Sequence, residues 1–183
     1  MKPLPLPSAV LLDRDGTINV KAPEGEYVTA PAGLRLIAGA AGAIRAFNRA
    51  GVPVAVVTNQ RGIARGLMSE QDLEAVHARL EQLLEQEGAF VDAIFHCPHE
   101  KGTCACRKPG TELLERARRR FGLATLADAV MIGDADSDVL AGHAAGARTV
   151  LLRAPAAPRP VEADEVAVTL AEAAERLLAR HFA

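Results

Sequence analysis

An apolar run that stops at two carboxylates constrains the fold of this chain more than any other feature. Residues 10–12 read Val-Leu-Leu, and Asp13, Asp15 and Gly16 follow directly. Such a run predicts a buried parallel strand whose carboxyl end opens into a functional loop. In open α/β sheets, ligands bind outside the carboxyl ends of the strands. Acids at this end therefore favour a chemical role over a structural one.

The spacing of Asp13 and Asp15 indicates what that role is. Side chains of an extended chain repeat every second residue, so both carboxylates start on the same side, and Gly16 lets the chain turn beside them. Two carboxylates that close repel each other unless a cation or a proton comes between them. We expect a divalent cation, one ionised nucleophile and one proton carrier. The alternative is an ordinary Asp-Gly turn with surface acids.

Later apolar runs also end in polar residues, and helical patterns separate them. One run, 52–59, ends in Thr58 and Asn59, and another ends in Asp134. Because a helix between two strands implies a right-handed crossover, the strands should be parallel and their polar ends should share one edge. We expect an α/β fold of the Rossmann-like kind, with three α/β/α layers around a central, mostly parallel sheet. Asp134 would then complete the cation site.

The other expected elements follow from periodicity and turn residues. Helices are predicted over residues 39–50, 69–87, 137–145 and 170–181, with a further helix beginning at Pro109, and strands over 91–96, 148–153 and 166–170.

Length and composition limit the possible functions. The 183 residues suit a single domain, 1–183, with no large cap domain. With 24% charged residues and a formal net charge of −2, the chain lacks the basic surface that nucleic acids and acidic membranes attract. No apolar run approaches the ~20 residues that span a bilayer. We therefore expect a cytoplasmic monomer that acts on a small molecule, with no membrane or nucleic-acid partner.

The cysteines predict a zinc site in the loop 97–106. All three of them, Cys97, Cys104 and Cys106, lie in this loop together with His99. Three thiols and one imidazole are enough for a closed tetrahedral Zn²⁺ site, and an odd cysteine count argues against a disulfide framework. With four protein ligands the metal would hold the loop rather than do chemistry. Free reduced cysteines are the alternative. His96 could compete with His99, but the preceding strand would point it elsewhere.

Three loops would surround the same edge of the sheet. Residues 20–33 contain prolines, glycines and the only tyrosine, which predicts a loop above the site, either a lid or an ordinary surface connection. Residues 60–67 form a basic loop suited to an anionic substrate. Arg107 and Lys108 follow the last zinc ligand, so the zinc loop would present two cations to a phosphate. Pro109 suits the first turn of the next helix.

Three further side chains receive expectations of their own. Asp138 could orient the cation site or accept a hydrogen bond from the lysine. Asp136 would cap the helix that starts at Ser137. His77 lies beside the apolar stripe of the 69–87 helix, and we expect a surface histidine without a role.

The motifs together resemble those of the haloacid dehalogenase superfamily. Asp-Arg-Asp-Gly-Thr at 13–17, Thr58, Lys108 and Gly-Asp at 133–134 occur in the order of the four superfamily motifs. More narrowly, Thr-Asn-Gln-x-Gly-Ile-Ala-Arg-Gly and Cys-Pro-His...Cys-x-Cys-Arg-Lys-Pro look like the phosphatases that remove the 7-phosphate of D-glycero-D-manno-heptose 1,7-bisphosphate. Histidinol-phosphate phosphatases share the zinc loop, so histidinol phosphate is the alternative substrate.

The resemblance implies roles for individual residues. Asp13 would attack phosphorus to form an aspartyl-phosphate, and Asp15 would protonate the leaving oxygen and later activate water. Thr58 and Lys108 would hold the phosphoryl group that is transferred. Such transfer depends on positioning and on charge neutralisation, which agrees with these residue types. Mg²⁺ would be bound by the carboxylates of Asp13 and Asp134 and the backbone carbonyl of Asp15. The rest of the sugar phosphate would be recognised by Asn59, Arg107, Lys21, Glu24, Gln60 and Arg61.

Two functions from other classes use some of the same residues. A phospho-accepting receiver module also carries strand-end acids, a threonine and a lysine, but Asp15 and the zinc loop argue against it. A zinc-organised nucleic-acid module would need a basic surface and aromatic side chains. A net charge of −2 and 3% aromatic residues supply neither.

Overall fold

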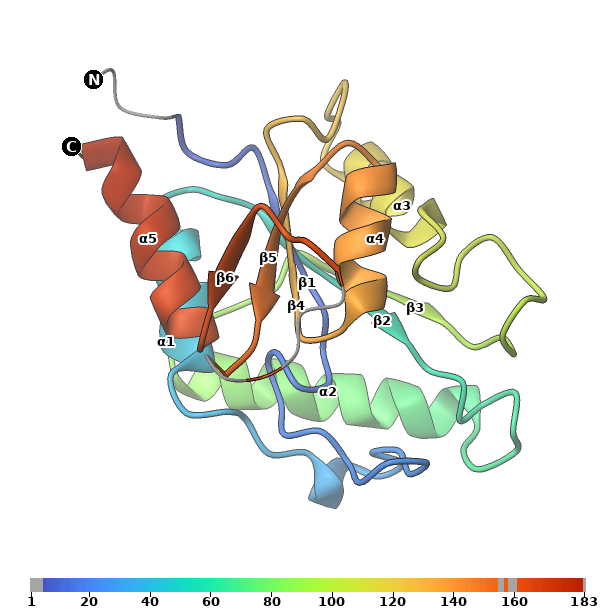
Figure 1. Ribbon diagram of the computed structural model, residues 1–183. Helices are drawn as coiled ribbons and strands as arrows, with labels where there is room; N and C mark the ends of the chain where they lie inside the picture. Colours follow the sequence, from blue (N-terminus) through green and yellow to red (C-terminus); the bar gives the residue numbers. More distant parts are fainter. Residues whose placement is uncertain (1–4, 155–156, 158–160, 183) are drawn as a thin grey trace.

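A parallel sheet forms the centre of the computed structural model, which describes residues 5–154, 157 and 161–182 (Figure 1). In this part of the chain, six strands pair in the order β3-β2-β1-β4-β5-β6, and every pair is parallel. The strands are β1 Val10–Leu12, β2 Val54–Asn59, β3 Ala93–Cys97, β4 Val130–Gly133, β5 Arg148–Leu152 and β6 Glu165–Ala167. The predicted mostly parallel sheet is therefore confirmed. The edge strand expected over 166–170 is present but spans Glu165–Ala167, and residue 170 already begins a helix.

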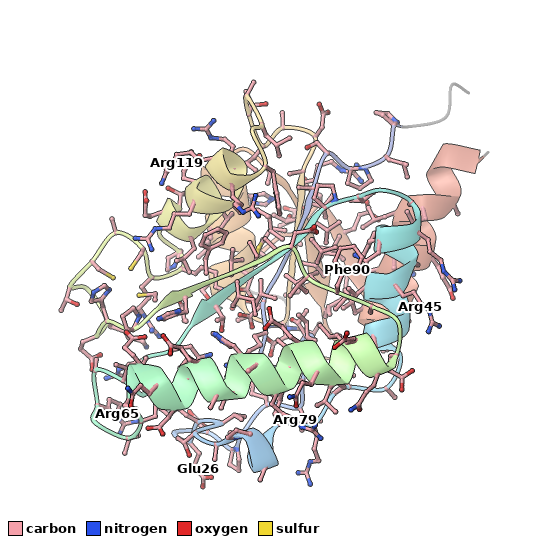
Figure 2. All side chains as sticks on the ribbon, turned by 180° about the vertical axis from the view of Figure 1, so that it is seen from behind. Glu26, Arg45, Arg65, Arg79, Phe90 and Arg119 are labelled. Atoms are coloured by element: carbon pink, nitrogen blue, oxygen red, sulfur yellow. The ribbon has the colours of Figure 1, made fainter. Side chains whose placement is uncertain are left out.

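Helices cover both faces of this sheet. They are α1 Ala40–Arg49, α2 Glu70–Gln86, α3 Glu112–Arg120, α4 Asp136–Ala144 and α5 Leu170–Phe182, with a short 3-10 turn at Pro31–Gly33. Apolar residues of α1, α2 and α5 pack on one face and those of α3 and α4 on the other. Figure 2 shows from behind how α2 lies across its face. The three α/β/α layers expected from the sequence are thus present.

The register places the polar strand ends together. Leu12 of β1 lies opposite Val56 of β2 and Ile132 of β4, so the residues that follow all three strands emerge at one edge. β1 is fully buried, because helices cover both faces of the sheet and β1 lies between β2 and β4, which pair with it on both sides. The polar strand ends therefore share one edge of the sheet, as right-handed crossovers predict.

Two local predictions at this edge are wrong. Pro109 does not lie in the first turn of α3, which begins at Glu112. The chain first makes a tight turn in which a Cβ on Gly110 would lie 2.2 Å from the carbonyl oxygen of Ala105. Asp136 is the first residue of α4 rather than its cap, and the carboxylate that accepts the backbone N–H of Ala135 is that of Asp138, at 3.0 Å.

None of the helices in the described ranges combines the length and the apolar character needed to traverse a lipid bilayer.

Candidate active site

Three carboxylates meet where β1 and β4 end. Asp13, Asp134 and Asp138 each offer an oxygen, and these oxygens lie within 4.8 Å of one another. Two glycines make the approach possible. A Cβ on Gly16, which has φ of +87°, would lie 2.4 Å from Asp134 Oδ2, and a Cβ on Gly133 would lie 2.1 Å from Asp138 Oδ2. Oxygen donors grouped in this way are the ligand set that Mg²⁺ takes.

Lys108 neutralises part of this charge. Its Nζ lies 2.7 Å from Asp13 Oδ1, 2.7 Å from Asp138 Oδ1 and 2.6 Å from the carbonyl oxygen of Val57. Burial alone would lower the pKa of Lys108, but the two carboxylates outweigh burial and raise it, so the ammonium group stays charged. Burial raises the pKa of Asp13 to about 6, against the attraction of Lys108. The expectation that Asp138 hydrogen-bonds the lysine is confirmed.

Asp15 points to a different set of partners. Its carboxylate accepts hydrogen bonds from Arg14 at 3.0 and 3.1 Å, from Asn19 at 2.9 Å and from Gln60 at 2.8 Å. Burial would raise the pKa of Asp15, but the Arg14 charge and these hydrogen bonds together lower it. The Asp15 carboxylate is therefore not one of the three that could share a cation. This agrees with the expectation that Asp15 would offer Mg²⁺ its backbone carbonyl instead of its side chain.

These side chains line one small cavity of about 190 Å³. Its lining residues are Asp13, Asp15, Lys21, Thr58, Asn59, Arg107, Lys108, Asp134, Ala135, Ser137 and Asp138. Every residue expected to be catalytic or to bind Mg²⁺ is therefore among them. The cavity offers several carboxylates, a hydroxyl and an ammonium group around a space that suits a phosphoryl group.

The residues expected to contact the rest of the substrate separate into two groups. Lys21, Asn59 and Arg107 line the small cavity, and Lys21 Nζ lies 2.9 Å from Asp134 Oδ2. The other three residues, Glu24, Gln60 and Arg61, lie elsewhere. Glu24 lines a neighbouring cavity of about 240 Å³ under the 20–28 loop, Gln60 is fully buried, and Arg61 pairs with Glu100 at 2.5 Å.

A wider cavity of about 610 Å³ adjoins the small one. Asn59, Arg107 and Lys108 line both cavities, and Lys101 of the zinc loop lines the wider one. A substrate whose phosphoryl group enters the small cavity would therefore extend over a surface rich in cations. This arrangement suits a second anionic group on the same molecule.

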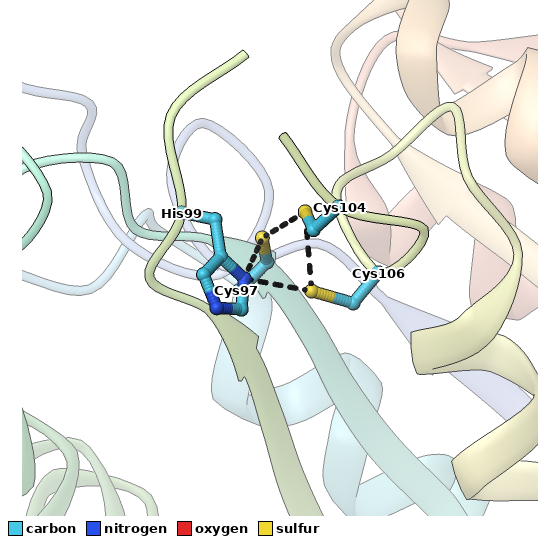
Figure 3. A group of neighbouring side chains, drawn as sticks. All are labelled: Cys97, His99, Cys104 and Cys106. Atoms are coloured by element: carbon cyan, nitrogen blue, oxygen red, sulfur yellow. Dashed lines mark hydrogen bonds between the residues drawn. The ribbon is translucent and has the colours of Figure 1, made fainter. Parts of the chain in front are cut away.

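The four expected zinc ligands form a compact group (Figure 3). Cys97, Cys104, Cys106 and His99 Nδ1 lie 3.2–3.6 Å from one another in the contacts of this group. Two sulfurs that bind the same Zn²⁺ at ~2.3 Å are about 3.8 Å apart in a tetrahedral site. The distances between the four ligand atoms therefore need to increase only slightly for the group to hold the ion. All three cysteines are free thiols. His96 instead contacts Glu70 at 2.8 Å, as expected from its place on the strand.

Comparison with known proteins now identifies the family. Residues 105–173 match the family model described as HAD-hydrolase-like. A D-glycero-beta-D-manno-heptose-1,7-bisphosphate 7-phosphatase of Mesorhizobium japonicum is 42% identical over 146 residues, which are 75% of this chain and 65% of that relative. The protein of the same name from Bordetella bronchiseptica is 35% identical over 92% of this chain and 97% of its own length. The chain belongs to the haloacid dehalogenase family.

A solved structure of a haloacid dehalogenase family member agrees with the fold. The D,D-heptose 1,7-bisphosphate phosphatase from B. bronchiseptica, complexed with magnesium and phosphate, is 34% identical to this chain. It superimposes with a TM-score of 0.85, covering 93% of this chain and 98% of that protein. The similarity in fold thus extends over nearly the whole chain.

Sequence reasoning missed a polar layer beneath this haloacid dehalogenase site. Arg14 is fully buried, and His77, expected at the surface, is half-buried on α2 beside it. The ring of His77 lies 6.0 Å from that of His96. A signal for Arg14 was present. Alternation in an extended chain turns residue 14 away from Asp13 and Asp15 and toward the face on which Leu12 is buried.

The pH dependence of stability should report on His77. Burial, followed by the charges of Arg14 and His96, lowers the pKa of His77 to about 3. The unfolded chain binds a proton at this ring below pH ~6.5 while the folded chain does not, so acid favours unfolding by at most about 1.4 kcal/mol per pH unit. In thermal unfolding from pH 7 to pH 4, His77→Leu should lose less stability than the wild type. An unchanged slope in His77→Leu would contradict the assignment.

Proposed function

We propose that the chain is a phosphatase that removes the 7-phosphate of D-glycero-β-D-manno-heptose 1,7-bisphosphate. The observation that carries the proposal is the cavity in which Asp13, Asp15, Thr58 and Lys108 converge beside Asp134. Relatives that carry the name of this activity match the chain over most of its length. The adjoining cavity with Arg107 and Lys101 supports a substrate with a second phosphate.

The proposed reaction gives each of two carboxylates its own role. An Asp13 oxygen attacks phosphorus while the bond from phosphorus to the sugar oxygen breaks. Asp15 is ionised beforehand because its pKa is lowered, so it takes a proton from the monoanionic phosphate group of the bound substrate and passes that proton to the leaving oxygen. In the second step Asp15 accepts a proton from water, which attacks the aspartyl-phosphate and releases inorganic phosphate together with the Asp13 carboxylate. Thr58 and Lys108 hold the phosphoryl oxygens through hydrogen bonding and charge.

Two metals fit the residues present. The carboxylates of Asp13 and Asp134, with the backbone carbonyl of Asp15, would bind Mg²⁺, because all three offer hard oxygen donors and the two carboxylates lie within 4.8 Å of each other. When bound, Mg²⁺ supplies charge neutralisation for the phosphoryl oxygens. The thiolate and imidazole donors at 97–106 suit Zn²⁺, which would fix the loop that carries Arg107 and Lys108.

Substrate recognition is assigned to residues around the small cavity. Arg107 is half-buried and its Nη1 has no hydrogen-bond partner among the described residues, so the guanidinium can accept an anionic ligand without breaking another contact. Asn59 binds the backbone of Lys108 at 3.0 and 3.1 Å, which supports a role in holding that loop. Lys21 and Glu24 remain proposed contacts on the 20–28 loop. Gln60 and Arg61 remain predictions, as do a cytoplasmic location and a monomeric state.

Side-by-side kinetics test the substrate. We expect kcat/KM for the β anomer of the heptose bisphosphate to exceed that for histidinol phosphate by at least about 100-fold, because the latter lacks the second phosphate. The α anomer, assayed in parallel, should fall between them. Arg107→Met should reduce the ratio of kcat/KM for the heptose bisphosphate to kcat/KM for histidinol phosphate. Arg118→Met, which changes an arginine of α3 away from the cavity, should leave this ratio unchanged. Equal or higher kcat/KM for histidinol phosphate would reject the proposed substrate.

A further inference from the structure

Arg14, between the two proposed catalytic carboxylates, is buried in an unusual way. Its side chain is fully buried, and its Nη2 donates to both carboxylate oxygens of Asp15, at 3.1 Å to Oδ1 and 3.0 Å to Oδ2. The Asp15 side chain is 23% exposed, so one end of the pair meets the cavity while the other end is closed to solvent. A single nitrogen shared between two oxygens restrains the rotation of the carboxylate as well as its position.

Two more donors complete a cage around Asp15. Asn19 Nδ2 lies 2.9 Å from Asp15 Oδ1, and Gln60 Nε2 lies 2.8 Å from Asp15 Oδ2. Both side chains are fully buried and are tied to other groups, Asn19 to the carbonyl oxygen of Val20 and Gln60 to Thr58 Oγ1. Each Asp15 oxygen therefore accepts two hydrogen bonds. The donors come from three positions along the chain, Arg14, Asn19 and Gln60.

The other end of Arg14 argues against a role in stability alone. Its Nε and Nη1 have no hydrogen-bond partner among the described residues, and His77 Nε2 is also unpartnered. Burying a guanidinium with two nitrogens unsatisfied costs free energy that an apolar side chain would not cost. The interaction that accounts for a buried arginine at this position is its ion pair with Asp15.

We propose that Arg14 is a positioning residue that acts through Asp15, holding the carboxylate in the orientation needed for proton transfer, with Asn19 and Gln60 as its helpers. The inference rests on the proposed function only in that Asp15 is the acid and base of the phosphatase reaction. It does not depend on which sugar phosphate is the substrate. Arg14 itself touches neither the phosphoryl group nor the leaving oxygen.

A substrate whose leaving group needs no proton distinguishes the two steps in which Asp15 acts. p-Nitrophenyl phosphate releases p-nitrophenolate, a stable anion that needs no proton when its bond to phosphorus breaks. Attack by Asp13 can therefore proceed without Asp15 as acid. Hydrolysis of the aspartyl-phosphate still requires a base to take the proton of water. A misplaced Asp15 should leave the first step with this substrate intact and slow the second.

Stopped-flow kinetics of p-nitrophenolate release test the proposal. Arg14→Met should lower steady-state kcat by about 100-fold with KM changed by less than about threefold. It should also show a burst of roughly one p-nitrophenolate per enzyme, as should Asp15→Asn. Arg14→Lys keeps the charge but loses the rigid planar group whose Nη2 contacts both oxygens of Asp15, and should show the same burst with a smaller loss of kcat. If Arg14→Met does not fold, Arg14→Lys decides the outcome. The matched control is Arg118→Met, whose arginine also pairs with a carboxylate, that of Glu115, and it should behave as the wild type.

A double variant shows whether Arg14 acts through Asp15. Arg14→Met combined with Asp15→Asn should be no slower than Asp15→Asn alone, because the two changes remove one function. Independent, multiplicative losses would overturn the proposal, as would an Arg14→Met enzyme with no burst or with wild-type kcat. If the wild type does not hydrolyse the heptose bisphosphate, the proposed substrate fails, while the p-nitrophenyl phosphate result still decides the role of Arg14.

Discussion

An Asp13→Asn variant should lose phosphatase activity by a factor on the order of 10⁴ or more while keeping its fold. The amide cannot form an acyl phosphate, and no other described carboxylate takes its position. Asp134 and Asp138 lie beside it, and each is held by its own cation, Lys21 and Lys108 respectively. Initial rates with a saturating phosphate monoester and a far-UV spectrum of the same sample measure both parts of the expectation.

The fold should tolerate this change because Lys108 keeps two other partners. Its Nζ still contacts Asp138 and the carbonyl oxygen of Val57 when Asp13 is neutral. An Asp72→Asn variant, which changes an exposed carboxylate at the start of α2, is the matched control and should retain full activity. Turnover within about tenfold of wild type in folded Asp13→Asn protein would refute the nucleophile assignment.

Removal of zinc should have the second-largest effect, a loss of about 100-fold or more in kcat/KM. Cys106 is followed directly by Arg107 and Lys108, so releasing the 97–106 loop would displace both cations from the phosphoryl and substrate positions. A displacement of ~1 Å at such groups is enough for a loss of this size. Treatment with a zinc-selective chelator, followed by metal analysis and kinetics, measures the effect.

Rescue distinguishes this account from simple loss of Mg²⁺. Added Zn²⁺ should restore activity, and added Mg²⁺ alone should not. Cys104→Ser should lose zinc and activity together, since a serine hydroxyl is a poor substitute for a thiolate ligand. Thr103→Val changes a neighbouring side chain that only bonds its own loop, and it should retain both. Full activity in protein shown to be free of zinc would contradict the role given to the loop.

Most of the site's residues could be predicted from the sequence because they follow from connectivity. Asp13, Thr58 and Asp134 each end an apolar strand, and right-handed crossovers make such strands parallel. Their convergence therefore needs no knowledge of packing. The cysteine loop was equally accessible, because four ligands within ten residues can meet without help from the rest of the chain.

The missed features depend on packing between distant elements. Arg14 follows Leu12, whose side chain packs in the same cluster as the apolar residues of α2, and His77 of α2 lies close enough to feel the Arg14 charge. Gln60 follows a basic-loop pattern in sequence, yet its side chain turns back to Asp15. Asp136 has the residue type of a helix cap, but Gly133 lets Asp138 approach closely enough to bind Lys108 and the Ala135 N–H. Tertiary contacts overrode local preference at each of these positions.

The central claim is that Asp13 becomes phosphorylated during turnover, and an acid-quenched single turnover followed by peptide mass spectrometry tests it most directly. We expect one phosphoryl group on the peptide that contains residue 13, present briefly in the wild type and accumulating in Asp15→Asn. Release of inorganic phosphate with no phosphorylated peptide at any time, in either protein, would contradict the account.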